Sequence, residues 1–504
     1  MTPTSDTKRP GSVKAEFDAD FRATSQGGAV LLEQTVRSLK IRRIVKKCLP
    51  ARSKDAQYAT EEVVMAIVQG LILGGRGQQA VEALREDDLL AEIVGQGAGA
   101  PSPSTVYRVL SEIAGIPAGR AFKEWYEKSG PRMARLDISG EEKALPATRR
   151  QVPDEPEAAT PERLAAMASL LRAVAMACAR ALPTSVVRTA GFAVVFGDAT
   201  DLEVEGRCFD AARMGRDGKE ILRWLTLMAG PILVGQRLMP GNHDEGASMP
   251  ALLEESKETV QDLAGRKTRI LALLDGAYFE WPVVGWLLKS RWHFIIGANQ
   301  QREVLTRLAQ EQPASVWTTT GPDAGRGWKD SEVACFTYSA KTWQKPVTIT
   351  ARRWLDLDDL PGMWHYTFVG TDLEERDLPQ DLLRKHGYAL AIWMLYGTKQ
   401  GRENHYKTSL EDLGLHHPPS GRLGLAQVFY VLGSVAHNIA MVLRYRVAQG
   451  EDRGITLWRL RERYFAIAGT LVRRGRSLLV KLSGIVDSGR QTLWRAALAE
   501  AGRI

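Results

Sequence analysis

The segment from Leu423 to Leu443 constrains the fold most, because its 21 residues include no Asp, Glu, Lys or Arg and an arginine flanks each end. A helix of this length is long enough to cross a lipid bilayer. Gln427, His437 and Asn438 interrupt the segment, and strongly polar side chains are costly in lipid. We therefore predict a helix buried in the core of a globular protein. The alternative is a membrane-associated protein whose solubility depends on detergent.

The composition is that of an ordinary globular chain. Of the 504 residues, 44% are hydrophobic and 25% are charged, which suggests roughly three to five folding units and excludes collagen, coiled-coil arrays and wholesale disorder. The net charge of +8 is concentrated near the C-terminus, where residues 396–504 hold 17 Lys and Arg against 8 Asp and Glu. This balance allows for an acidic partner without requiring one. The four cysteines fit neither a disulfide framework nor a metal motif, and the first residues form no apolar signal segment, so we expect a reducing, cytoplasmic compartment.

The order of helix-like and strand-like patterns predicts an α/β fold with a central sheet. Helical spacing dominates the N-terminal part, strands and helices alternate in the middle, and β-branched and aromatic runs separated by turn residues interrupt the second half. We expect the following segments: a flexible tail (1–26), a helical DNA-binding domain (27–135), a linker (136–162), the first part of the core (163–300), a β-rich insertion (301–376), the second part of the core (377–445) and a basic helical C-terminal region (446–504).

Residues 101–115 resemble the second helix of a helix-turn-helix. The segment has a Ser/Thr cap, a proline just before the helix and an apolar stripe. Ser104, Tyr107, Arg108 and Ser111 are expected on its solvent face, where a groove-reading helix presents side chains to phosphates or base edges. The alternative is a packing helix with a polar outer face.

Three carboxylates stand out as candidates for chemistry. Asp198 follows the apolar run GFAVVFG and Asp275 follows ILALL, so each is expected at the C-terminal end of a buried strand, where open α/β sheets place their ligand sites. Turn-forming residues are the alternative. Glu403 begins a predicted helix, with Lys407 one turn further on, a pattern that a surface ion pair also explains. Clustered carboxylates repel one another unless cations lie between them, and two divalent ions about 3.5–4 Å apart suit phosphodiester chemistry.

The motifs GDATD, PGN, LLDGAYF, ENHYK, DLGLHHPPSGR and AHN resemble the DDE transposases of bacterial insertion sequences, which belong to the RNase H-like superfamily with retroviral integrases. The resemblance covers roughly residues 191–479. The group's signature is Y-x2-R-x3-E-x6-K. Tyr396 and Glu403 match it, Lys399 stands at the arginine position, and Leu410 stands at the final lysine position.

The resemblance implies a fold, a site and an activity. It implies an RNase H-like core in which Asp198, Asp275 and Glu403 are catalytic and bind two Mg²⁺, with Mn²⁺ as a substitute. DNA contacts are then expected from Tyr396, from Lys399, which lacks the planar bidentate geometry of arginine, and from Lys407, one turn before the missing final lysine. Asp201 is expected to be a turn residue or to support the site from outside it.

Two further regions are candidates for DNA contact. Related transposases have a β-rich insertion between the second and third carboxylates, and its aromatic side chains could stack on a flipped base, although core packing is the alternative. The arginines near the C-terminus alternate with apolar residues, so they line either a phosphate track or a solvated helix face. The candidates are Trp317, Trp328, Trp343, Trp354 and Trp364 in the insertion and Arg459, Arg463, Arg473, Arg474 and Arg476 near the C-terminus.

The sequence therefore predicts a DNA transposase that binds terminal inverted repeats, acts as an endonuclease at the DNA ends and joins them to target DNA. By the same resemblance we expect double-stranded DNA as the partner, at least a homodimer in the synaptic complex, no membrane, and a bacterial, nucleoid-associated location. A catalytically silent DNA-binding protein of transposase descent is the alternative.

Overall fold

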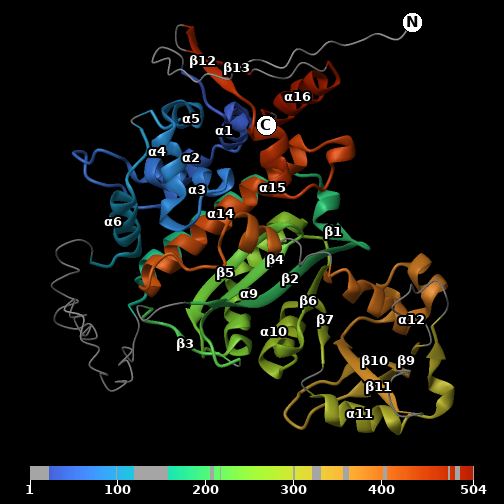
Figure 1. Ribbon diagram of the computed structural model, residues 1–504. Coiled ribbons are helices and arrows are strands. Elements are labelled where there is room, and N and C mark those ends of the chain that lie inside the picture. Colours follow the sequence, from blue (N-terminus) through green and yellow to red (C-terminus); the bar gives the residue numbers. More distant parts are fainter. Residues whose placement is uncertain are drawn as a thin grey trace, which may run out of the picture.

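The computed structural model describes residues 22–97, 99–117, 157–204, 209–215, 217–298, 301–320, 331–355, 363–400, 406–474, 477–482 and 488–502. The N-terminal part is a helical unit, blue in Figure 1. Its helices are α1 (Val30–Ser38), α2 (Ile41–Cys48), α3 (Thr60–Leu73), α4 (Glu82–Glu86), α5 (Asp88–Ile93) and α6 (Pro103–Ala114). In α3 every residue except Glu61 and Glu62 is buried, so this helix is the centre of the unit.

A large mixed sheet follows, in the strand order β3-β4-β2-β6-β7-β11-β10-β9-β8, with β5 also paired to β4 and β1 to β2. Strands β2, β6 and β7 are parallel to one another, whereas β4 and β5 form an antiparallel meander with β2. The strands are β1 (Arg188–Thr189), β2 (Phe192–Glu203), β3 (Arg213–Met214), β4 (Glu220–Ala229), β5 (Ile232–Pro240), β6 (Ile270–Leu274), β7 (His293–Gly297), β8 (Thr318–Thr319), β9 (Ser331–Tyr338), β10 (Val347–Leu355) and β11 (Trp364–Thr371).

Helices connect and cover this sheet. Helix α9 joins β5 to β6 and α10 joins β6 to β7, as crossover connections between parallel strands require. Helix α12 changes direction at Gly387, whose φ of 68° suits a residue without a Cβ. The helices of this part are α8 (Pro161–Arg180), α9 (Glu245–Ala264), α10 (Trp281–Ser290), α11 (Arg302–Gln310), α12 (Gln380–Gly397) and α14 (Leu423–Val447).

The strands predicted between residues 301 and 376 are present, but they do not form a sheet of their own. Strand β11 pairs antiparallel with β7, so β11, β10, β9 and β8 extend the central sheet. The register places Val369 opposite Gly297 and Thr371 opposite Ile295. A buried strand such as β7 needs a partner on both edges to satisfy its backbone groups, and β11 provides the second one.

The prediction of helices throughout the C-terminal region is wrong for residues 469–482. This segment forms the hairpin β12 (Gly469–Arg474) and β13 (Ser477–Leu482), between α15 (Leu457–Leu460) and α16 (Ser488–Ala501). Leu471 pairs with Val480 across the hairpin. Val480 and Leu482 pack against the core and Leu479 is exposed, as the alternating faces of a strand require. Thr24 and Gly469 exchange two backbone hydrogen bonds of 2.9 Å, which ties the start of the helical unit to this hairpin.

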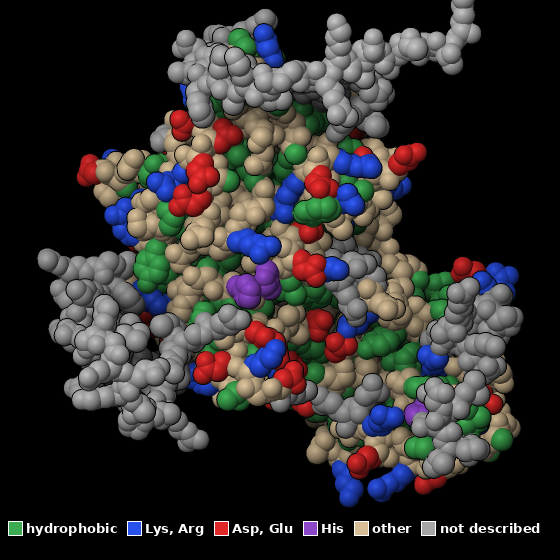
Figure 2. All heavy atoms as spheres, viewed as in Figure 1, with side chains coloured by type: hydrophobic (Ala, Val, Ile, Leu, Met, Phe, Trp, Pro, Cys, Tyr) green, Lys and Arg blue, Asp and Glu red, His purple; other side chains and the backbone are tan. Residues whose placement is uncertain are grey.

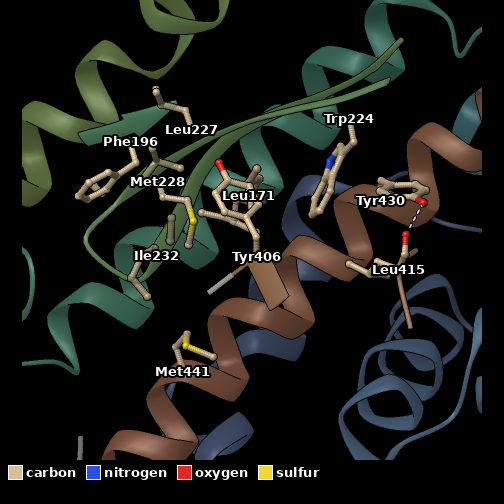
Figure 3. Packing of buried hydrophobic residues seen from close by; sticks show 14 of the residues in the cluster. Leu171, Phe196, Trp224, Leu227, Met228, Ile232, Tyr406, Leu415, Tyr430 and Met441 are labelled. Atoms are coloured by element: carbon tan, nitrogen blue, oxygen red, sulfur yellow. Dashed lines mark hydrogen bonds between the residues drawn. The ribbon is translucent and has the colours of Figure 1, made fainter. Parts of the chain in front are cut away.

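Helix α14 is the long apolar segment, and it runs between the helical unit and the sheet (Figure 1). Among the described residues it is the helix long and apolar enough to span a membrane, and 94% of its most apolar stretch is buried inside the protein. This burial agrees with the predicted core helix. Figure 3 shows Met441 of α14 in the same cluster as Met228 of β4 and Ile232 of β5.

The polar residues of α14 bond the backbone of β5 and of Pro231 just before it, and β5 pairs only with β4 among the described strands. The Gln427 side chain donates to the carbonyl oxygen of Leu238 (3.3 Å). His437 shares a hydrogen bond with the carbonyl oxygen of Pro231 (2.9 Å), and Asn438 bonds both the N–H and the carbonyl of Leu233 (2.8 and 2.9 Å). These side chains therefore take the place of a neighbouring strand at this edge.

His437 predicts how stability depends on pH. Burial lowers its pKa to about 4, and the charge of Arg444 acts in the same direction. The unfolded chain takes up a proton below about pH 6.5 and the folded chain does so only near pH 4, so the free energy of unfolding should fall as the pH drops through this window. We expect His437→Gln to remove about 2 kcal/mol of the loss between pH 7 and pH 5, measured by urea unfolding. Equal losses in both proteins would contradict the neutral, buried state of His437.

Candidate active site

Asp198 and Asp275 are neighbours because β2 and β6 are parallel and in register. The last pair of this ladder is Gly197 with Leu274, and the two aspartates follow directly. Asp198 does not end its strand, which differs from the prediction: β2 continues to Glu203 because β4 continues beside it, whereas β6 stops at Leu274. The site therefore lies where β6 ends and β2 continues without it.

The two carboxyl groups interact strongly. Burial and then the negative charge of Asp275 raise the pKa of Asp198 to about 7, and a hydrogen bond between the two carboxyl groups adds to the rise. One carboxylate oxygen of Asp198 accepts the N–H of Ala199 (2.9 Å). Two oxygen ligands of like charge at such short range fit a divalent cation between them. Among the described residues there is no group of three or more His, Cys, Asp or Glu arranged to hold a metal.

Lys399 contacts this pair, which the sequence did not predict. Its ammonium forms an ion pair and hydrogen bond with Asp275 Oδ1. The Tyr396 hydroxyl, one turn earlier, donates to the carbonyl oxygen of Leu274 (3.3 Å), and so anchors the end of α12 to the end of β6. The positive charge of Lys399 lowers the pKa of Asp198 and partly offsets the effect of burial.

Tyr406 contacts the strand that runs beside Asp198. It is buried, its hydroxyl lies 2.5 Å from Thr226 Oγ1, and Thr226 is the partner of Asp198 across β2 and β4. Figure 3 shows Tyr406 within the hydrophobic cluster that also holds Phe196 and Met228. Glu403, the third predicted carboxylate, lies outside the described residues. The described chain before it reaches Asp275 through Lys399, and the chain after it reaches Thr226, the β4 partner of Asp198, through Tyr406.

Comparison with known families decides the identity. The family model described as transposase DDE domain group 1 matches residues 6–129 and 229–500. The chain belongs to this transposase family. Asp275 and Glu403 lie inside the matched residues and Asp198 lies outside them. No curated protein matches the chain. One solved structure, a cryo-EM structure of a piggyBac transposase synaptic complex with hairpin DNA, aligns at 9% identity with a TM-score of 0.36, over 85% of this chain and 77% of that chain.

Further residues near the aspartates of this transposase escaped the prediction. Tyr278 is buried beside them, and its hydroxyl has no hydrogen-bond partner among the described residues. Burial, Glu245 and Asp198 all raise the pKa of Tyr278. Its place in LLDGAYF, three residues after Asp275, was the available signal. Asp201 is not in a turn, because it lies in β2 and accepts two hydrogen bonds from Arg223 (2.8 and 3.2 Å).

The predicted groove-reading face of α6 is only partly exposed. Ser104 and Arg108 are exposed, but Tyr107 is half-buried and its hydroxyl lies 3.3 Å from Arg422 Nη1. Ser111 is fully buried and donates to the carbonyl oxygen of Tyr107, so its predicted exposure is wrong. The start of α14 packs against α6 and covers this side.

The other predicted DNA contacts lie in different places. Lys407 is exposed and 3.7 Å from Glu411, while Arg473 and Arg474 belong to β12 and Arg476 lies outside the described residues. On the face shown in Figure 2, the Lys and Arg side chains that the structure describes are interspersed with Asp and Glu. A single basic patch is therefore not visible among them there.

The predicted aromatic side chains of the β-rich segment are mostly packed against neighbours. The Arg353 guanidinium lies over the rings of Trp317 and Trp364, 4.0 and 4.3 Å from their centroids. Trp354 stacks on His365, and Trp343 packs against Phe279 and Trp281. Trp328 lies outside the described residues.

Proposed function

We propose that this transposase binds the terminal inverted repeats of its element, cleaves the DNA ends by metal-assisted hydrolysis and joins them to target DNA by transesterification. The observation that carries the proposal is the close pair formed by Asp198 and Asp275 where β6 ends. Such a pair provides oxygen ligands for a hard divalent cation. Membership of the transposase family supports DNA as the substrate.

In this proposal Asp198, Asp275 and Glu403 hold two Mg²⁺, or Mn²⁺ in their place. The bound ions supply activation of the attacking hydroxyl and stabilisation of the leaving 3′-oxygen. The N–H of Ala199 fixes one oxygen of Asp198 and so orients the carboxylate. Glu403 is the third ligand because it lies four residues after Lys399 and three before Tyr406, and both of these contact the surroundings of the aspartates.

The wider setting is part of the same proposal. The core is RNase H-like, with the order of β2, β4, β5, β6 and β7 in its support, and the element is a bacterial insertion sequence. Tyr396, Lys399, Lys407 and Arg108 contact DNA. Two copies hold the two DNA ends in the synaptic complex, in the cytoplasm and at the nucleoid.

The test is cleavage of a labelled duplex that carries the element ends, which the genomic DNA flanking the gene provides as inverted repeats. With Mg²⁺ we expect cuts that leave free 3′-hydroxyls, and joined products once a target plasmid is added. Excess EDTA should abolish both. A duplex with scrambled ends is the control. Specific binding of the ends without cleavage in Mg²⁺ or Mn²⁺ would instead identify a silent DNA-binding protein of transposase descent.

The basic C-terminal region predicts the salt dependence of DNA binding. Replacing Arg473, Arg474 and Arg476 by glutamine should weaken binding and flatten the slope of log K against log salt by roughly 0.9 for each phosphate that is no longer neutralised. Arg172→Gln is the matched control, because Arg172 is already paired with Glu258 (2.7 Å) and Asp262 (3.4 Å). An unchanged slope in the triple variant, measured by fluorescence anisotropy, would exclude these arginines from the DNA interface.

A further inference from the structure

Lys399 does not have the exposed position expected of a residue that mainly binds DNA. Its side chain is only 11% exposed, and its ammonium is directed at Asp275, whose side chain is 44% exposed. The position is fixed by the protein, because Tyr396 holds the end of α12 on Leu274 and Lys399 follows one turn later, with its N–H bonded to the carbonyl oxygen of Tyr396 (2.9 Å).

A lysine in this place has a definite electrostatic effect. The ammonium is a compact charge on a flexible stem, so it can neutralise a carboxylate and also swing away from it. Asp275 forms the candidate site together with Asp198, and the charge of Lys399 acts on both. A divalent ion bound between the aspartates would repel an ammonium in contact with one of them. Binding of a metal between the aspartates and contact of Lys399 with Asp275 therefore oppose each other.

We propose that Lys399 is a built-in counter-ion, which pairs with Asp275 beside Asp198 in the metal-free protein and is displaced when a divalent ion binds. The inference rests on the proposed function, because it takes the aspartates to be metal ligands. Lys399 is thus a positioning residue that keeps two like charges together before the metal arrives. Once displaced, its ammonium is released at the edge of the site, where a DNA phosphate can take it up.

Binding of Mn²⁺ to the full-length protein without DNA tests the competition, with free Mn²⁺ measured by electron paramagnetic resonance at pH 8. We expect Lys399→Met to bind Mn²⁺ roughly 5- to 20-fold more tightly than wild type, because an ion pair whose lysine is nearly buried is worth more than the factor of about five that a fully exposed pair reaches. Lys399→Arg keeps the charge and should stay near wild type. Lys407→Met removes an exposed lysine paired with Glu411 and should change the affinity less than twofold.

Amine labelling of the wild-type protein gives a second readout that needs no variant. Acetylation of Lys399, quantified by mass spectrometry, should be slow in the metal-free protein and several-fold faster with saturating Mn²⁺, while Lys407 reacts equally in both. Unchanged or weaker Mn²⁺ binding by Lys399→Met, or labelling of Lys399 that ignores Mn²⁺, overturns the counter-ion role. If Asp198→Asn binds Mn²⁺ as wild type does, the metal site itself is wrong, and the proposed function fails with it.

Discussion

Asp198→Asn and Asp275→Asn are each expected to lower the rate of DNA-end cleavage on the order of 10³-fold or more. Asparagine keeps the shape of the side chain, and at position 198 its oxygen can still accept the N–H of Ala199. It carries no negative charge, however, and so cannot balance a divalent ion. The measurement is single-turnover cleavage of a labelled end duplex with Mg²⁺.

Asp201→Asn is the matched control, since Asp201 lies three residues further along the same strand and bonds Arg223. Its cleavage rate should stay within a few-fold of wild type. A wild-type cleavage rate in either Asp198→Asn or Asp275→Asn would show that the two aspartates do not form the catalytic site.

The Asp198→Asn variant should also gain stability, which separates a functional loss from misfolding. The pKa of Asp198 is raised to about 7, so the folded protein holds a proton that the unfolded chain has already released above about pH 4. The free energy of unfolding of the wild type therefore falls as the pH rises from about 4 to about 7. Without metal at pH 8, Asp198→Asn should be more stable by roughly 1–4 kcal/mol in urea unfolding. A variant that is both inactive and less stable would indicate a structural defect instead.

Asn438→Ala is expected to destabilise the protein by about 3 kcal/mol or more, the largest effect predicted for a residue outside the site. Asn438 is fully buried, and its amide satisfies both backbone groups of Leu233. Leu233 is next to Val234, which has no partner across β4 because the register shifts there. Alanine would leave a buried N–H and a buried carbonyl unpaired at a bulge, where no strand can replace the missing hydrogen bonds.

Ser434→Ala, one turn earlier on α14, is the control for this prediction. Ser434 is equally buried, but within the described part of the chain its hydroxyl bonds only the carbonyl oxygen of Tyr430 in the same helix (2.8 Å). Its loss should therefore cost less than about 1 kcal/mol. Urea unfolding of the two variants side by side gives the comparison. Similar losses in both would show that Asn438 contributes volume rather than hydrogen bonds.

The sequence predicted those features that depend on local patterns. Apolar runs marked β2 and β6 and placed an aspartate directly after each run. The two aspartates are neighbours because the parallel strands are in register, which the runs alone did not show. The burial of α14 followed from its polar residues, but their partners on β5 did not, since a bulge at Val234 leaves no trace in hydropathy.

The predictions that failed have a common physical cause, because the features concerned depend on contacts between distant parts of the chain. Lys399 stands at the arginine position of the expected signature, and its contact with Asp275 depends on where α12 ends on the sheet. Ser111 has the polarity of a surface residue but is fully buried on a helix that packs against α14 and other helices. The hairpin at 469–482 was mistaken for helix because its apolar residues and arginines stand in adjacent groups and do not show the strict alternation that marks a strand.

The place of α14 has a consequence for how the chain is made. This helix fills the space beside α3, but α3 ends at Leu73 and α14 begins at Leu423 (Figure 1). On a ribosome that adds roughly 5–20 residues per second, the partner of α3 is synthesised about 20–70 s later. During that interval the nascent helical unit cannot cover its apolar surface, so we expect it to engage chaperones and to aggregate when expressed alone.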